Sequence, residues 1–186
     1  MAVQLPRRRL TVEDFHRMAQ AGILTEDDRV ELLDGELIEM TPIGSRHAGC
    51  VNRLNRAFAQ RVGDRALVSV QNPIRIAEHS EPQPDMALLR PRADFYAQGH
   101  PEPQDVLLVV EVAETSLEVD REVKVPLYGK AGIPEVWLVD LAEGCVEVYR
   151  TPTPHGYAER QRMRPGQQLS TQEIPSLVLT VDEILG

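Results

Sequence analysis

Hydrophobic residues are densest at residues 106–110, and the carboxylate of Glu111 follows directly. Five consecutive apolar residues are typical of a strand that is buried on both faces of a sheet. A buried, unpartnered carboxylate costs roughly several kcal/mol, so Glu111 should be paired, metal-bound or placed where the strand meets water. Lys124 follows in a segment with helical spacing. A strand carboxylate and a helix lysine therefore define the first candidate site.

A β-hairpin is predicted over residues 29–40. Its turn is Asp34-Gly35, a dipeptide that favours the two positive φ angles of a type I′ turn. This turn places Glu31 opposite Ile38, on a face that is not obviously polar. Glu31 is therefore either a functional carboxylate or an edge-strand glutamate whose head group lies in water.

A helix is predicted over residues 45–62, with Ser45 as its N-cap. Its apolar stripe, extended back by one turn, reaches His47. The imidazole should then point inward near the helix N-terminus, where the helix dipole favours anions. His47 is either a site residue or a structural histidine.

Asp85 stands at the start of a short apolar strand, which is expected to neighbour the strand of Glu111. An acid in this position is also common as a turn residue. The remaining pattern predicts a helix over 11–21, a strand over 66–77 interrupted by Pro73, an irregular loop over 90–104, strands over 135–140, 145–150 and 157–163, an irregular tail from 165 to about 176, and a terminal helix over 182–185.

The segment after Glu111 has two helical stripes. Asp120, Lys124 and Tyr128 recur every four residues and should share one face. The neighbouring stripe, which is expected to pack on the sheet, consists of Val119, Val123, Leu127 and Ala131. Lys124 would then lie at the border of core and solvent, with an Asp120–Lys124 surface pair as the alternative to a functional role. Pro126 indicates that the helix either starts late or is kinked.

Composition narrows the function classes. The 186 residues are 42% apolar and 26% charged, which suits one domain over residues 1–186 with its characteristic elements at about 11–150. The net charge of −9 disfavours a generally basic surface but allows a local basic groove. Two cysteines, Cys50 and Cys145, suit a reducing cytoplasm. No apolar run has the length of a membrane span.

Asp85, Glu111 and Lys124 are the strongest chemical candidates, because the chain has no Gly-rich phosphate loop, nucleophile elbow, HExxH or CxxC motif. Two carboxylates on adjacent strands can bind Mg²⁺, which prefers oxygen ligands. Such a metal lowers the pKa of a bound water, and a nearby lysine can orient or deprotonate that water. This set of residues is chemically sufficient for phosphodiester hydrolysis.

Several stretches resemble the Uma2 family: VELLDGELIEM, the SRH helix start, QPDMALL, VVEVAETS, DREVKVPLYGKAGIPEVWLVD and VEVYR. The resemblance implies the restriction-endonuclease-like fold of PD-(D/E)xK nucleases, an α/β fold with a central mixed sheet, flanking helices and added β-hairpins. It maps the two motif acids onto Asp85 and Glu111. The usual lysine position is Ala113, so Lys124 would replace that lysine from the next helix. Glu31 and His47 become secondary site residues.

The resemblance therefore implies a metal-dependent nuclease that uses Mg²⁺ or Mn²⁺, held by Asp85 and Glu111, with DNA favoured over RNA. It also suggests a homodimer, for which the 145–150 strand could offer an exposed edge. Two alternatives stay open. The protein is a non-catalytic interaction or assembly module that kept the fold, or its acids and lysine form a purely structural, buried ion-pair network.

Overall fold

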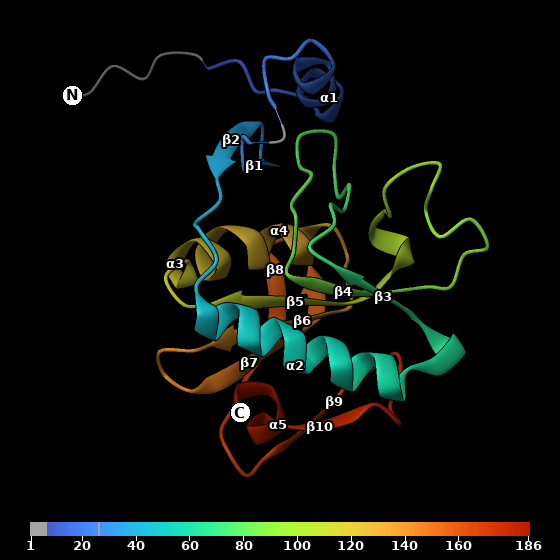
Figure 1. Ribbon diagram of the computed structural model, residues 1–186, viewed down its shortest axis with the longest axis vertical. Helices are drawn as coiled ribbons and strands as arrows, with labels where there is room; N and C mark the ends of the chain where they lie inside the picture. Colours follow the sequence, from blue (N-terminus) through green and yellow to red (C-terminus); the bar gives the residue numbers. More distant parts are fainter. Residues whose placement is uncertain (1–6, 26) are drawn as a thin grey trace.

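The computed structural model describes residues 7–25 and 27–186, and its centre is a six-stranded mixed sheet (Figure 1). Neighbouring strands are antiparallel, except that β5 and β6 are parallel. All eight residues of β5 are buried, so the predicted central strand is confirmed. The strands in spatial order are β3 (Leu67–Val70), β4 (Met86–Leu89), β5 (Val106–Ala113), β6 (Glu135–Asp140), β7 (Cys145–Thr153) and β8 (Gly156–Met163).

Helices cover both faces of this sheet (Figure 1). On one face, α2 (Ser45–Arg61) and α5 (Val181–Leu185) enclose a cluster that includes Leu54, Phe58 and Trp137. On the other face, α4 (Val125–Lys130) encloses a second cluster around Tyr128. Two 3₁₀ turns, η1 (Gly63–Arg65) and η2 (Pro103–Asp105), lead into β3 and β5. Within the described residues, no helix has both the length and the apolar character needed to cross a membrane.

The predicted hairpin is confirmed as β1 (Val30–Leu33) and β2 (Glu36–Glu39), which form a sheet of their own. Asp34 and Gly35 have φ angles of 51° and 84°, as the turn chemistry requires, and Glu31 lies opposite Ile38 as expected. The helix α1 (Val12–Gln20) precedes the hairpin and begins at a capping box. This N-terminal unit lies above the main sheet in Figure 1.

Four local predictions are wrong. Gly44 is the N-cap of α2, without a side-chain bond, and Ser45 is already helical. The strand predicted over 66–77 ends at Val70, because Gln71 has a φ of 51° and turns the chain away. The tail predicted to be irregular contains β9 (Gln168–Ser170), which pairs with β10 (Val178–Thr180). The predicted exposed edge at 145–150 is internal, since β7 pairs with β6 and β8.

The helix after β5 also differs from its prediction. It consists of α3 (Leu117–Val119), a π-helical turn η3 (Asp120–Lys124) and α4. Pro126 has no N–H and would crowd the carbonyl four residues earlier in a regular helix, so the wider turn accommodates it. The change in winding leaves Val119 and Val123 about 40% exposed, against the predicted stripe. Lys124 is only 4% exposed, so its predicted position at the solvent border is wrong.

Candidate functional site

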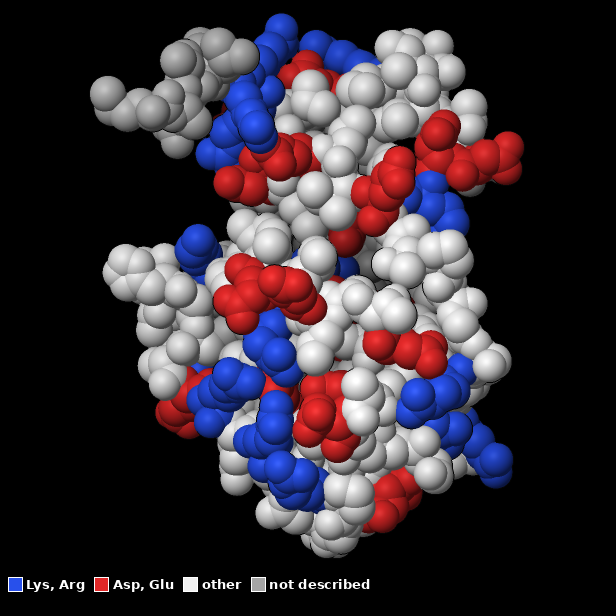
Figure 2. All heavy atoms as spheres, turned by 90° about the vertical axis from the view of Figure 1, so that its left-hand side faces the viewer, with Lys and Arg blue, Asp and Glu red and all other residues white. Residues whose placement is uncertain are grey.

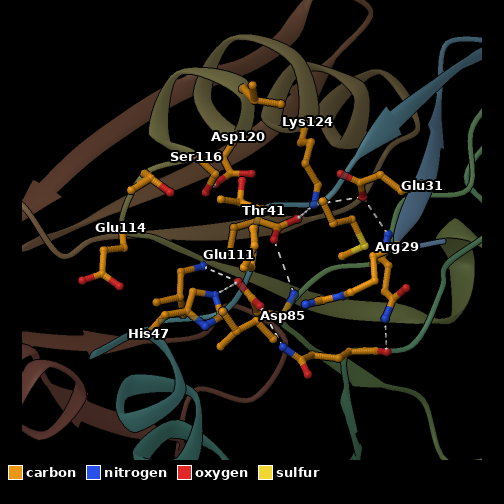
Figure 3. Close-up of a pocket in the computed structure, with 18 of the residues that line it drawn as sticks. Arg29, Glu31, Thr41, His47, Asp85, Glu111, Glu114, Ser116, Asp120 and Lys124 are labelled. Atoms are coloured by element: carbon orange, nitrogen blue, oxygen red, sulfur yellow. Dashed lines mark hydrogen bonds and ion pairs between the residues drawn. The ribbon is translucent and has the colours of Figure 1, made fainter. Parts of the chain in front are cut away.

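All five site residues predicted from the sequence line one cavity of about 360 Å³ (Figure 3). The cavity lies where the β1–β2 hairpin, the start of α2, the edge of β4 and β5, and the π-helical turn meet. Polar side chains from segments that are far apart in the sequence therefore line the same cavity. These residues are Glu31, His47, Asp85, Glu111 and Lys124.

Asp85 lies beside Glu111 because of strand register. Met86 pairs with Val110, so the residue before Met86 falls next to the residue after Val110. The Val112 N–H donates to Asp85 Oδ2 at 2.9 Å. His47 Nε2 lies 2.9 Å from the same oxygen. Among the described residues, the other oxygen, Oδ1, has only a long 3.4 Å contact, with Gln71 Nε2. The carboxylate of Asp85 is thus fixed through one oxygen.

The carboxylate of Glu111, like that of Asp85, makes its close contacts through one of its two oxygens. Its Oε1 lies 2.8 Å from Lys124 Nζ and accepts the hydroxyl of Tyr128 at 2.6 Å. Within the part of the chain that the structure describes, its Oε2 has only a 3.4 Å contact, with the N–H of Asp85. Lys124 Nζ also lies 3.2 Å from Glu31 Oε2. One ammonium group therefore bridges two carboxylates that come from the central sheet and from the hairpin.

The electrostatics of this cluster follow from burial and from its excess of acids. Burial raises the pKa of Glu111 above the ordinary range of a carboxyl group; Lys124 opposes this rise, while the charges of Asp120, Asp85 and Glu31 add to it. Burial by itself would lower the pKa of Lys124, but the three acids Glu111, Glu31 and Asp120 outweigh it and raise that pKa. Lys124 is therefore a permanent ammonium at neutral pH.

His47 and Asp120 complete the polar lining. The hydrogen bond to Asp85 raises the pKa of His47 and outweighs the opposing effect of burial. Among the described residues, His47 Nδ1 is buried and has no hydrogen-bond partner. Burial raises the pKa of Asp120, whose carboxylate accepts the Ser116 hydroxyl at 2.5 Å. The imidazole of His47 and the carboxyl group of Asp120 are thus both part of the polar lining of the cavity.

The donor set fits a divalent cation. The cavity lining has more carboxylates than cationic side chains: its acids are Glu31, Glu39, Asp85, Glu111, Glu114 and Asp120, and its permanent cations are Arg29 and Lys124. Asp85 Oδ1 and Glu111 Oε2 are the least engaged oxygens of the two central acids. Hard cations such as Mg²⁺ and Mn²⁺ prefer carboxylate oxygens of this kind.

Sequence reasoning placed two further residues on the face of Lys124 but gave them no role. Asp120 is 5% exposed and lines the cavity, so the alternative of an Asp120–Lys124 surface pair is wrong. Tyr128 is fully buried and donates to Glu111. The four-residue spacing of Asp120, Lys124 and Tyr128 was the sequence signal that could have indicated a place for all three residues near the site. Gln71, by contrast, contacts Asp85 because its backbone has a positive φ angle, and no sequence pattern predicts that conformation.

Comparisons with known proteins identify the family and the fold. The family model of Uma2, described as "Putative restriction endonuclease", matches residues 12–182. Among solved structures, the crystal structure of "a putative nuclease belonging to DUF820" from Anabaena variabilis ATCC 29413 matches with a TM-score of 0.73. The match covers 95% of this chain and 97% of that chain at 18% sequence identity, so it establishes a shared fold. The curated proteins contain no match.

The family match extends from the first residue of α1 into α5. It therefore includes every segment on which the resemblance was based and also the β9–β10 pair near the end of the chain. The predicted mixed α/β fold, with a central sheet and flanking helices, is confirmed as well. The chain belongs to the Uma2 family.

Proposed function

We propose that this protein is a metal-dependent nuclease that hydrolyses phosphodiester bonds of nucleic acid, with Mg²⁺ or Mn²⁺ as the metal. The observation that carries the proposal is the convergence of Asp85, Glu111 and Lys124 on one cavity. Asp85 and Glu111 come from adjacent strands and leave one oxygen each weakly engaged. The family description and the nuclease title of the solved relative support the same chemistry.

Asp85 and Glu111 would hold the metal, which when bound lowers the pKa of a water ligand and offsets the negative charge of a phosphodiester. The remaining roles belong to the chain. Val112 N–H and His47 fix the orientation of Asp85. Lys124 keeps its proton, because the surrounding acids raise its pKa. It would therefore donate a hydrogen bond to the attacking water or to a phosphate oxygen, and would stabilise developing negative charge.

Nucleic acid is the proposed substrate, with DNA favoured over RNA by the family resemblance. An arginine cluster supports contact with a phosphate backbone, and its first member, Arg121, directly follows the cavity-lining Asp120. Arg121, Arg160 and Arg162 all pair with Glu147, at 2.9, 2.7 and 3.0 Å. Arg121 also lies 3.6 Å from Asp140, so two carboxylates face three guanidinium groups and the cluster keeps positive charge for phosphate contacts. On the face drawn in Figure 2, one group of basic side chains lies over the lower half and another at the top, with acids near the middle and also among the lower basic group.

The test is a nicking assay on plasmid DNA with Mg²⁺, Mn²⁺ or EDTA. Activity is expected only with a divalent metal, and Asp85→Ala or Lys124→Ala should abolish it. Asp64→Ala and Lys130→Ala remove exposed residues of the same types outside the cavity and should leave activity unchanged. Circular dichroism checks that each variant is folded. Activity that survives in both cavity variants would refute the proposal.

The alternative is a non-catalytic interaction or assembly module. It is favoured by the burial of Lys124, whose ammonium is already bridged by two carboxylates and is 4% exposed. This alternative predicts that Mg²⁺ and Mn²⁺ leave the melting temperature unchanged. The nuclease proposal predicts an increase, because a ligand that binds only the folded state stabilises it. A homodimer is also proposed, and its candidate sheet edge is β8 instead of β7.

A further inference from the structure

A second group of metal-ligand side chains lies outside the cavity. It consists of His16 on α1, Glu81 in the segment between β3 and β4, and His100 in the loop between β4 and β5. One ligand atom from each residue lies within 4.8 Å of the other two. His16 Nε2 is 2.7 Å from Glu81 Oε1, and the two imidazole rings are edge-on, with centroids 6.1 Å apart. None of the three residues lines the acidic cavity described above.

Glu81 provides the observation that points to a ligand. The residue is 3% exposed, and its Oε2 has no hydrogen-bond partner among the described residues. Its backbone is fixed, because the Glu81 N–H donates to the Leu32 carbonyl at 2.8 Å. A buried carboxylate oxygen without a partner carries a desolvation penalty that one histidine contact on the other oxygen does not remove. A cation bound at this position would satisfy it.

The ligand types define the class of cation. Two imidazoles and one carboxylate form the donor set of zinc sites with an open fourth position, and imidazole suits Zn²⁺ or Co²⁺ far better than Mg²⁺. The His16 side chain is 42% exposed and His100 is also exposed, so solvent can reach the open position. We infer that His16, Glu81 and His100 form a transition-metal site of the Zn²⁺ class that fastens α1 to the two loops.

This site differs in chemistry from the acidic cavity and does not depend on the proposed nuclease function. The cavity offers oxygen ligands from the central sheet, whereas the His16 site offers mainly nitrogen ligands from peripheral segments. The three ligands come from segments that are separate in the sequence, so a bound ion would cross-link them. A bound ion would stabilise this part of the fold through that cross-link, and an exchangeable water would complete its coordination.

The purified protein is titrated with Co²⁺, whose visible absorption bands indicate tetrahedral ligation. In a second experiment, its melting temperature is measured with and without Zn²⁺. Wild-type protein should develop the Co²⁺ bands, and its melting temperature should rise with Zn²⁺. His16→Ala and His100→Ala should each weaken Co²⁺ binding about tenfold or more. His155→Ala removes an exposed histidine in the β7–β8 turn and serves as the matched control that should bind like wild type. Glu81→Gln is informative only if circular dichroism shows it folded.

Asp85→Ala separates this site from the cavity, and it should leave Co²⁺ binding unchanged. Three results would overturn the inference: no Co²⁺ bands in the wild-type protein, unchanged binding in both His16→Ala and His100→Ala, or loss of binding in Asp85→Ala alone. Failure of the nuclease assay would leave this test unaffected, because the readout here is metal ligation and not hydrolysis.

Discussion

Replacing Lys124 by methionine removes the ammonium group that bridges Glu111 and Glu31. Methionine keeps much of the apolar stem of the side chain, so the main loss is the ammonium, which lies 2.8 Å from Glu111 Oε1 and 3.2 Å from Glu31 Oε2. All three side chains are at most 7% exposed, so water in the cavity can replace the lost contacts only in part. The variant therefore leaves two buried carboxylates without the cation that compensates them.

The magnitude follows from breaking a buried ion pair by removing one partner, which costs about 3 to 5 kcal/mol. For a protein of this size, each kcal/mol corresponds to about 2 to 4 °C in melting temperature, so Tm should fall by roughly 6 to 20 °C. Adding Glu111→Gln removes one of the two unpaired charges. The double variant should therefore recover about 0.5 to 3 kcal/mol relative to Lys124→Met alone.

The assay is urea unfolding at neutral pH of wild type, Lys124→Met, Glu111→Gln and the double variant, each with and without Mg²⁺. Lys130→Met is the matched control, because Lys130 is exposed and makes no ion pair among the described residues. In Lys124→Met, Mg²⁺ should restore stability more than it adds to wild type, since the cation offsets the charge that the lysine carried. The restored stability should reach about 2.7 kcal/mol at a metal concentration of 100 Kd.

Two results would refute this reasoning. If Lys124→Met costs no more than the exposed Lys130→Met, the ammonium does not compensate the buried acids. If the effects of Lys124→Met and Glu111→Gln simply add, the two residues do not form one electrostatic unit. The Mg²⁺ arm further separates two interpretations. A purely structural ion-pair network predicts no metal effect on either protein, whereas the proposed metal site predicts an effect on both.

Three further predictions concern pH, packing and substrate binding. The pKa of His47 is raised in the folded protein, so its stabilising contribution is complete below about pH 6.5 and is lost as pH rises through its pKa in the folded state. Urea unfolding between about pH 6 and 9 should therefore show the stability of His47→Gln approaching that of wild type as pH rises. Gly129→Ala should cost about 1 to 3 kcal/mol in the same assay, because its Cβ would lie 2.5 Å from backbone atoms of β8, whereas Gly99→Ala meets nothing within 4 Å. Arg160→Ala with Arg162→Ala should weaken DNA binding in fluorescence anisotropy and lower the slope of log K against log salt by about 2.

Each of these predictions can fail. A constant deficit of His47→Gln across the pH range would mean that its bond to Asp85 does not shift the titration. Equal stability of the two alanine variants would show that α4 can move away from the turn that faces Gly129. An unchanged salt slope in the double arginine variant would mean that the substrate backbone does not reach this cluster.

Local chemistry made the hairpin and the central strand predictable. The turn residues Asp34 and Gly35 fix the pairing register of β1 and β2 by their backbone geometry, so the position of Glu31 followed without tertiary information. The run of apolar residues in β5 likewise predicted a strand that is buried on both faces. In both cases, the deciding interactions lie within a few residues of one another.

Other features of the helix after β5 and of the site depend on tertiary structure and could not be predicted from local sequence. Helical spacing assigned Val119 and Val123 to the core, but the π-helical turn changes the winding and exposes them. Burial of Lys124 depends on carboxylates from β5 and from the distant hairpin, and no local pattern around the lysine records those partners. The side chain of Gln71 reaches Asp85 only because its strand ends in a positive φ angle.

The proposed replacement of the motif lysine by Lys124 is compatible with the geometry of β5. Residues two apart on a strand share a face, so Ala113 lies on the same side of β5 as Glu111. That face is covered by α4, whose Tyr128 bonds to Glu111. The small side chain of Ala113 leaves this side to the helix, and Lys124 approaches from the π-helical turn that leads into α4. The proposed chemistry requires a cation within contact distance of the strand carboxylate, and two positions on different elements can supply it. A lysine in the helix also reaches Glu31 on the hairpin, so it couples the added β1–β2 unit to the centre of the fold.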